Sequence, residues 1–161
     1  MNATRTMMSF SVAALLLGAC QPQAAQFTDQ DRSILTATFD SALTYFRAKN
    51  WKAWAGLYTE DGVLLPAHAP TLHGRAALVT WGQSFPPIEE LTFSNVEVWG
   101  EGNMGYGTSG LALKVQGAPP DTGKQLVVFR RPTGGRWAVV AVAFSSDLPL
   151  PRASQPSVRN R

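Results

Sequence analysis

The sequence predicts an α+β domain in which three N-terminal helices pack on one face of a curved antiparallel sheet. Two observations support this fold class. Between residues 28 and 48 the apolar residues recur at spacings of 4, 3 and 4, the period of a helix with one buried face. From residue 91 to residue 145 the chain consists of extended apolar segments separated by turns that contain glycine and proline. A chain of 161 residues is long enough for one such domain.

The N-terminal segment predicts export from the cytoplasm. One positive charge, Arg5, precedes an uncharged and largely apolar run over residues 7–17. This run is shorter than the roughly 20 residues that a membrane-spanning helix needs, and it has the length of a signal-peptide core. It ends in Leu-Gly-Ala-Cys20, which resembles the lipobox of bacterial lipoproteins. The resemblance implies that residues 1–19 are removed and that Cys20 is lipidated.

Lipidation of Cys20 would anchor the protein to a membrane of the bacterial cell envelope, because several acyl chains together bind stably. Gln21 follows the cysteine, where an aspartate in lipoproteins often signals retention in the inner membrane. The resemblance therefore implies the outer membrane if the cell is Gram-negative. Residues 20–27 are expected to form a lipidated tether. A net charge of +3 is too small to indicate a nucleic-acid partner.

Two of the three helices have recognisable starts. Thr28 is a good N-cap for the first, and Asp29 and Asp31 in its first turn face the positive end of the helix dipole. Asn50 caps a short second helix that is rich in aromatic residues. The third helix is predicted over residues 75–85, where two prolines stop it.

The sheet is predicted to begin with a short strand over residues 63–65. This strand follows a turn at residues 60–62 and is apolar throughout, so we expect it to be buried on both sides. Pro66 and Pro70 keep the loop after it irregular. Four further strands are predicted over residues 91–99, 104–115, 125–131 and 136–145. The domain spans residues 28–148, and residues 149–161 are expected to form a disordered tail.

The last strand predicts a homodimer. Strict alternation divides its apolar residues between two faces, with Ala138, Val140, Val142 and Phe144 on one and Trp137, Val139, Ala141 and Ala143 on the other. A sheet with one face in water would alternate with polar residues instead. Three helices can cover only one face, so we expect a second copy of the protein on the other.

Several short motifs resemble one protein family. They are Leu57-Tyr58-(x)₂-Asp61-(x)-Val63, His73-Gly74-Arg75, Gly123-Lys124, Phe129-Arg130-Arg131, Arg136-Trp137 and Phe144-Ser145-Ser146-Asp147. Their order resembles the SnoaL-like members of the nuclear transport factor 2-like superfamily, and most of all its uncharacterised branch of domains of unknown function. The resemblance covers residues 28–148. It implies a cystatin-like cone, in which helices close one end of a bent sheet around an apolar pocket.

The resemblance does not choose a reaction, because the superfamily includes isomerases, polyketide cyclases, dehydratases, epoxide hydrolases and non-catalytic binding modules. The ketosteroid isomerases place a base after the first strand, where this chain has Pro66. Their phenolic donor corresponds to a position near Ala42, and their second acid donor to the strand at residues 126–128. All three positions are apolar here, so we expect no steroid isomerase activity.

Aromatic residues are the candidate ligand contacts. A cone lined by aromatic rings with few polar groups suits a small apolar ligand, although such rings can also fill the space completely. The candidates are Tyr45, Trp54, Tyr58, Trp81, Trp99 and Tyr106, with His68 at the pocket mouth.

The ionisable candidates are few. Asp61 is a weak candidate for an acid or base, but we favour a structural ion pair between Asp61 and Arg75. His68 is a weak candidate for a proton carrier, and its spacing of five from His73 is not a zinc signature. Residues 100–105 match G-x-G-x-x-G, but a strand follows them where a dinucleotide site needs a helix. The sequence therefore predicts neither a metal nor a cofactor.

These observations favour an envelope lipoprotein that is dimeric and binds a small apolar molecule in its cone. Two alternatives stay open. One is a small-molecule cyclase, dehydratase or hydrolase that uses Asp61 or His68. The other is a structural or assembly module without catalysis.

Overall fold

The computed structural model describes residues 26–149 of the chain. The predicted signal peptide, Cys20 and residues 150–161 of the predicted tail lie outside the described residues. No helix of the described part is long and apolar enough to cross a membrane.

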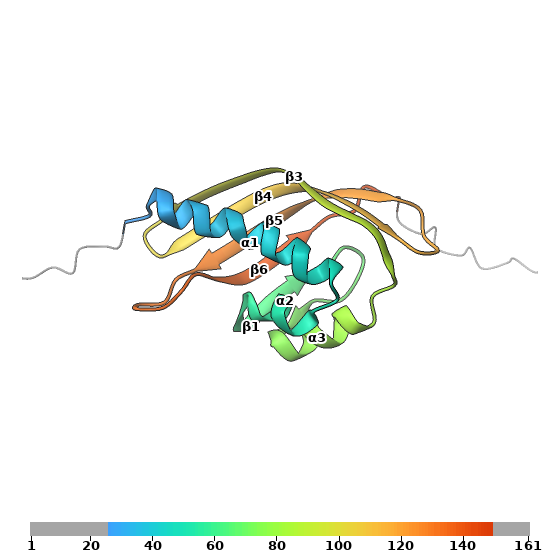
Figure 1. Ribbon diagram of the computed structural model, residues 1–161, viewed down its shortest axis with the longest axis horizontal. Helices are drawn as coiled ribbons and strands as arrows, with labels where there is room; N and C mark the ends of the chain where they lie inside the picture. The colour runs from blue at the N-terminus through green and yellow to red at the C-terminus, as the bar shows by residue number, and fades with distance from the viewer. Residues whose placement is uncertain (1–25, 150–161) are drawn as a thin grey trace, which may run out of the picture.

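The three predicted helices are present. Helix α1 spans Asp29–Arg47, α2 spans Trp51–Gly56 and α3 spans Gly74–Gln83. Thr28 and Asp31 form a capping box at the start of α1. The Thr28 hydroxyl accepts a hydrogen bond from the backbone N–H of Asp31, and the Asp31 carboxylate accepts one from the backbone N–H of Thr28. In Figure 1, α1 lies across one face of the sheet, and α2 and α3 lie together at the end near β1.

Six strands form one sheet in the order β2-β1-β6-β5-β4-β3. The strands are β1 (Tyr58–Leu65), β2 (Leu72–His73), β3 (Ile88–Glu101), β4 (Met104–Val115), β5 (Asp121–Arg130) and β6 (Ala138–Phe144). The α+β class is confirmed, and the sheet stays open rather than closing into a barrel. The sheet is mixed, because β1 runs parallel to β6 while every other pair is antiparallel. Three hairpins carry the chain from β3 to β6 and return it beside β1 in the same direction.

Strand β1 differs from its prediction. The expected turn at residues 60–62 lies inside the strand, at a bulge in its pairing with β6 between Tyr58 and Val63. Leu64 is 2% exposed and its neighbour Leu65 is 41% exposed. The prediction that this strand is buried on both sides is therefore wrong, because Leu64 faces the core and Leu65 the opposite face.

Two glycines of β4 allow α1 to lie close to the sheet. A Cβ atom at Gly105 would come within 2.6 Å of Leu35 Cδ2, and one at Gly107 within 2.9 Å of the Phe39 ring. Leu35 and Phe39 are both buried. Phe39 packs edge-on against Phe93, with ring centroids 6.1 Å apart. The small residues of β4 thus set the distance at which the helix packs.

The inner face of the sheet forms the core. One row of this face crosses four strands and contains three buried valines, Val98, Val127 and Val142. Gly107 of β4 pairs with Val98 on one side and with Val127 on the other. The next row, on the outer face, contains Trp99, Tyr106, Val128 and Ala141. Trp99 is 38% and Tyr106 47% exposed, so no helix covers them.

The predicted alternation in β6 is interrupted at one residue, so the faces predicted for Ala138 and Val139, which precede it, are wrong. Val128 pairs with Ala141 and Phe129 with Val139, so Val140 is left over as a β-bulge. The bulge places Val139 on the same inner face as Val142, and both are buried. Strict alternation had placed these two residues on opposite faces. A register shift of this kind depends on the neighbouring strand.

The carboxylate of Asp31 fixes the start of α1 to the β5–β6 connection. It is 4% exposed and accepts four hydrogen bonds. Two come from Thr28, through its backbone N–H and its hydroxyl at 2.9 Å each. The other two come from Arg131 Nη1 at 2.5 Å and Trp137 Nε1 at 2.8 Å. These bonds, with that of Trp137 foremost, hold the pKa of Asp31 below its ordinary value of 3.8.

Replacing Asp31 tests this attachment. We expect Asp31→Asn to lower the free energy of unfolding at neutral pH by about 1–3 kcal/mol, because an amide cannot accept all four bonds or balance Arg131. A pKa that is lower in the folded state gives stability that is present above pH 3.8 and lost as the pH falls through the folded value. Urea unfolding at a series of pH values from about 2 to 7 measures both the loss of stability at neutral pH and its dependence on pH.

Asp29→Asn is the matched control, because Asp29 lies in the same helical turn but is exposed. The account requires Asp31→Asn to flatten the acid limb of the stability curve and Asp29→Asn to leave it nearly unchanged. Equal losses in the two variants would contradict a special role for Asp31.

Candidate functional site

A cavity of about 100 Å³ lies between α1 and the inner face of the sheet. Its wall is almost entirely apolar, and none of the described residues that line it is charged. Helix α1 contributes Ala42 and Phe46, and the sheet contributes Val127, Phe129 and Val142. An apolar cavity of about 150 Å³ can stay dry and bind benzene. The space in this protein therefore suits a small apolar group.

Aromatic rings close the cavity at the end where α2 and α3 meet. Phe46 packs edge-on against Trp54 at 5.3 Å and against Phe85 at 5.3 Å between ring centroids. All three rings line the cavity. Trp81 stacks behind Trp54 at 6.0 Å and supports it from outside the lining. This cluster gives the cavity a rigid end, since each ring is held by at least one other.

Two polar side chains interrupt the apolar wall on the sheet side. Tyr58 is 3% exposed, and burial raises the pKa of its phenol well above the usual value, so the hydroxyl stays protonated. Gln125 donates a hydrogen bond from Nε2 to the buried Ser109 hydroxyl at 2.8 Å. Both Tyr58 and Gln125 line the cavity. They are neutral groups that can hydrogen-bond one polar atom of a ligand.

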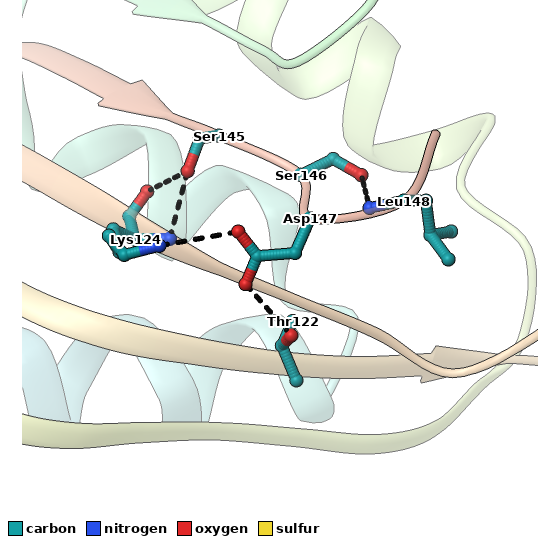
Figure 2. Close-up of polar contacts among 6 residues, drawn as sticks. All are labelled: Thr122, Lys124, Ser145, Ser146, Asp147 and Leu148. Carbon is teal, nitrogen blue, oxygen red and sulfur yellow. Dashed lines mark hydrogen bonds and ion pairs between the residues drawn. The ribbon is translucent and has the colours of Figure 1, made fainter. Parts of the chain in front are cut away.

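The segment after β6 is held to β5 by polar contacts, shown in Figure 2. The Asp147 carboxylate accepts from the Thr122 hydroxyl at 2.9 Å and from Lys124 Nζ at 3.2 Å. These hydrogen bonds, that of Thr122 first, lower the pKa of Asp147. A Cβ atom at Gly123 would lie 2.0 Å from the Ser145 carbonyl oxygen, so this close approach requires glycine. Together with the backbone bonds from Ser145 to Lys124 and from Asp147 to Thr122, these contacts continue the β5–β6 pairing beyond the end of β6.

A polar groove of about 850 Å³ adjoins the cavity. It runs between the first half of α1, the start of β1 and the β5–β6 connection. Thr38 and Leu57 line both spaces, so the groove and the cavity share a wall. Arg75, Arg131 and Arg136 line the groove.

The structure brings two of the predicted ligand contacts into the cavity wall, Trp54 and Tyr58. Tyr45 and Trp81 are half-buried against the core but outside the lining. Trp99 and Tyr106 stack on each other at 5.2 Å on the outer face of the sheet. The prediction that these two rings line the cone is therefore corrected, because the register of β3 and β4 turns both away from it.

The ionisable candidates also lie away from the cavity. His68 is exposed in the loop after β1, with φ at 56°, and Asp61 is exposed at the bulge of β1. The predicted ion pair of Asp61 with Arg75 does not form. Arg75 pairs with Glu60 and donates to the Tyr58 carbonyl oxygen, because the bulge gives Glu60 the position facing the helix. Within residues 26–149, no three His, Cys, Asp or Glu side chains gather as metal ligands.

Sequence reasoning missed two features of this region, the place of Gln125 in the cavity wall and the long-range hydrogen bonds of Asp31. Gln125 lies two residues before Val127 and four before Phe129, and counting by twos along β5 would have placed it on the inner face. Asp31 stands three residues after Thr28, the spacing of a capping box, but nothing local indicates its bonds to Arg131 and Trp137.

The cavity wall is apolar at two of the positions that the isomerase resemblance singles out. Ala42 lines the cavity from α1, where a phenolic donor would stand, and Val127 lines it from β5, in the strand of the second donor. Pro66 is outside the lining. The described wall therefore offers no carboxylate to act as a base.

Comparison with known proteins identifies the fold and the family. The SnoaL-like domain matches residues 39–144, more than half of the chain. A comparison with curated protein sequences finds no match.

Solved structures with the same fold are distant in sequence. A ketosteroid isomerase-like protein from Erwinia carotovora atroseptica superposes with a TM-score of 0.63 at 20% identity, over 76% of this chain and 100% of that one. A protein of unknown function with a cystatin-like fold from Nostoc punctiforme gives 0.67 at 14% identity, over 78% and 98%. A nuclear transport factor 2-like protein of unknown function from Pseudomonas putida gives 0.66 at 15% identity, over 76% and 91%. The fold agrees with these structures and the family match covers residues 39–144, so the chain belongs to the family of SnoaL-like domains.

Proposed function

We propose that this protein is a lipid-anchored binding module that holds a small apolar molecule in the cavity between α1 and the sheet. One observation carries the proposal, namely a preformed cavity of about 100 Å³ with an apolar wall that is rich in aromatic rings. The protonated Tyr58, the Gln125 amide and Thr38 are the polar members of its wall, and they suit a ligand with at most one or two polar atoms in the cavity.

The described residues give less support to an enzyme of the cyclase, dehydratase or hydrolase kind. General acid–base catalysis needs a titratable group within hydrogen-bond reach of the reacting atom. Asp61 and His68, the candidates for that role, are exposed and do not line the cavity. An assembly module remains the second alternative, and the outer face of the sheet is the surface it would use.

The proposed location is the bacterial cell envelope. It rests on the lipobox-like sequence ending at Cys20, with Gln21 favouring the outer membrane of a Gram-negative cell. In this arrangement the acyl chains hold the protein on the membrane, and the tether leaves the domain free to take up a ligand.

Filling the cavity tests the binding proposal. Ala42 lies on α1 and lines the cavity, so the larger side chain of Ala42→Leu should occupy the space of the ligand. We expect the variant to lose binding of benzene in titration calorimetry. Its free energy of unfolding should rise by about 1 kcal/mol, because the new methyl groups become buried.

Ala37→Leu is the matched control on the same helix, because Ala37 is exposed. It should bind benzene as the unmodified protein does. If the unmodified protein does not bind benzene, or if both variants bind it equally well, the cavity is not the binding site.

We also propose that two copies associate through the outer face of the sheet. Its central rows present Trp99, Tyr106, Leu126 and Leu65 at exposures between 38% and 47%. An apolar patch of this kind, rimmed by charge, is typical of an interface. Its rim carries opposite charges on different strands, with Glu97 and Glu101 on β3 and Lys124 and Arg130 on β5.

This arrangement suits a two-fold axis. In a symmetric dimer the same patch meets itself, so the acidic rim of one copy can face the basic rim of the other. The cavity lies on the opposite side of the sheet, so association would leave it accessible.

A charge placed in the centre of the outer face tests the dimer. We expect Tyr106→Lys to convert the protein from dimer to monomer in light scattering, because two lysines would meet near the axis without partners. Ile34→Lys is the control, since Ile34 is 44% exposed but lies on α1 across the sheet. A monomeric unmodified protein, or a Tyr106→Lys variant that remains dimeric, would rule out this interface.

A further inference from the structure

We infer that the ligand is a small amphiphilic anion, with its apolar body in the cavity and a carboxylate in the adjoining groove on Arg131 and Arg136. This inference rests on the proposed binding function and adds the chemical class of the ligand. It follows from the charge of the groove and from the wall that the groove shares with the cavity.

The groove carries a surplus of positive charge. Three guanidinium groups line it, those of Arg75, Arg131 and Arg136, against one carboxylate, that of Asp31. Asp31 balances Arg131, and Glu60 balances Arg75, so Arg136 is the lining cation that no ion pair balances within residues 26–149. The groove therefore favours an anion over a neutral or cationic group.

The three arginines differ in the ion pairs and hydrogen bonds that they already make within the protein. Arg75 is committed to Glu60 and to the Tyr58 carbonyl oxygen. Arg131 donates a hydrogen bond from Nη1 to Asp31, and its guanidinium lies over the Trp137 ring, with Cζ 4.9 Å from the ring centroid. These two contacts orient the guanidinium, and most of its N–H groups have no acceptor within residues 26–149. Arg136 is exposed, and no ion pair involves it in the described part of the chain. Arg131 and Arg136 are thus the two that can bind a carboxylate.

The groove and the cavity border each other at two shared residues, and we propose that one amphiphile occupies both. Thr38 of α1 and Leu57 at the start of β1 line both spaces, and both are half-buried. On one side of this pair the wall is apolar, and on the other it holds the arginines. A molecule bound across Thr38 and Leu57 would keep its hydrocarbon part in the apolar cavity and place its carboxylate in the groove that Arg131 and Arg136 line.

The test compares two ligands of equal length on the full chain. Hexanoate and 1-hexanol both contain six carbons and share a pentyl chain, and they differ only at the terminal carbon, which is a carboxylate in one and a CH₂OH group in the other. We expect hexanoate to bind about tenfold more tightly than 1-hexanol in titration calorimetry, because its carboxylate gains charge-assisted hydrogen bonds. This preference should shrink as salt is added, since the groove is open to solvent.

Arg136→Gln should remove most of the preference for hexanoate and leave 1-hexanol binding unchanged. Lys52→Gln is the matched control, because it removes the same charge from an exposed position on α2 outside the groove. It should leave both affinities unchanged.

The outcomes separate this inference from the proposed function. If neither ligand binds, the binding proposal itself fails. If both bind with equal affinity, or if Arg136→Gln and Lys52→Gln have the same effect, the cavity binds apolar molecules but the arginines do not select an anion. Only a preference that depends on Arg136 and on salt supports the inference.

Discussion

The hydrogen bonds of the Asp31 carboxylate are the interaction on which the binding region depends. Through them the first turn of α1 is joined to Arg131 and Trp137, about a hundred residues further along the chain. A buried carboxylate is costly unless every one of its acceptor positions is used, and here four donors surround it. Gly105 and Gly107 then let the middle of the helix pack closely on β4. Together these contacts fix the distance of α1 from the sheet and the direction of its axis.

The position of α1 creates the cavity and the groove together. The helix packs tightly where the glycines lie, whereas the small side chain of Ala42 leaves space over Val127 and Val142. Nearer its start the same helix forms one side of the groove, with Asp31 drawing Arg131 into place. An apolar site and a cationic site therefore lie side by side because one helix borders both. Helices on one face also leave the outer face of the sheet available to a partner.

Much of the fold could be predicted from the sequence because its signals are local. The period of α1, its cap at Thr28 and the glycine turns between the later strands each depend on neighbouring residues. The parallel pairing of β1 with β6 and the bulge at Val140 could not be predicted in this way, because each depends on a partner strand far along the chain. One bulge was enough to reassign Val139 to the other face.

The candidate site was less predictable for the same reason. Aromatic residues were correctly identified as a group, but their faces depend on register, which places Tyr58 in the cavity wall and Tyr106 on the outer face. The arginines of the groove come from two distant segments of the chain. Arg75 pairs with Glu60 rather than with Asp61 because β1 has a bulge at this point. Charge and aromatic content predict a kind of site, whereas tertiary pairing decides which residues form it.

Methyl NMR during a benzene titration tests the central claim most directly, because it reports which face of the sheet binds. Val127 and Val142 line the cavity, whereas Val128 and Leu126 lie on the outer face of the same strand pair. We predict saturable shifts of the Val127 and Val142 methyl signals, with those of Val128 and Leu126 nearly unchanged. Shifts confined to the outer face, or no saturable shift at any of the four residues, would contradict a binding cavity between α1 and the sheet.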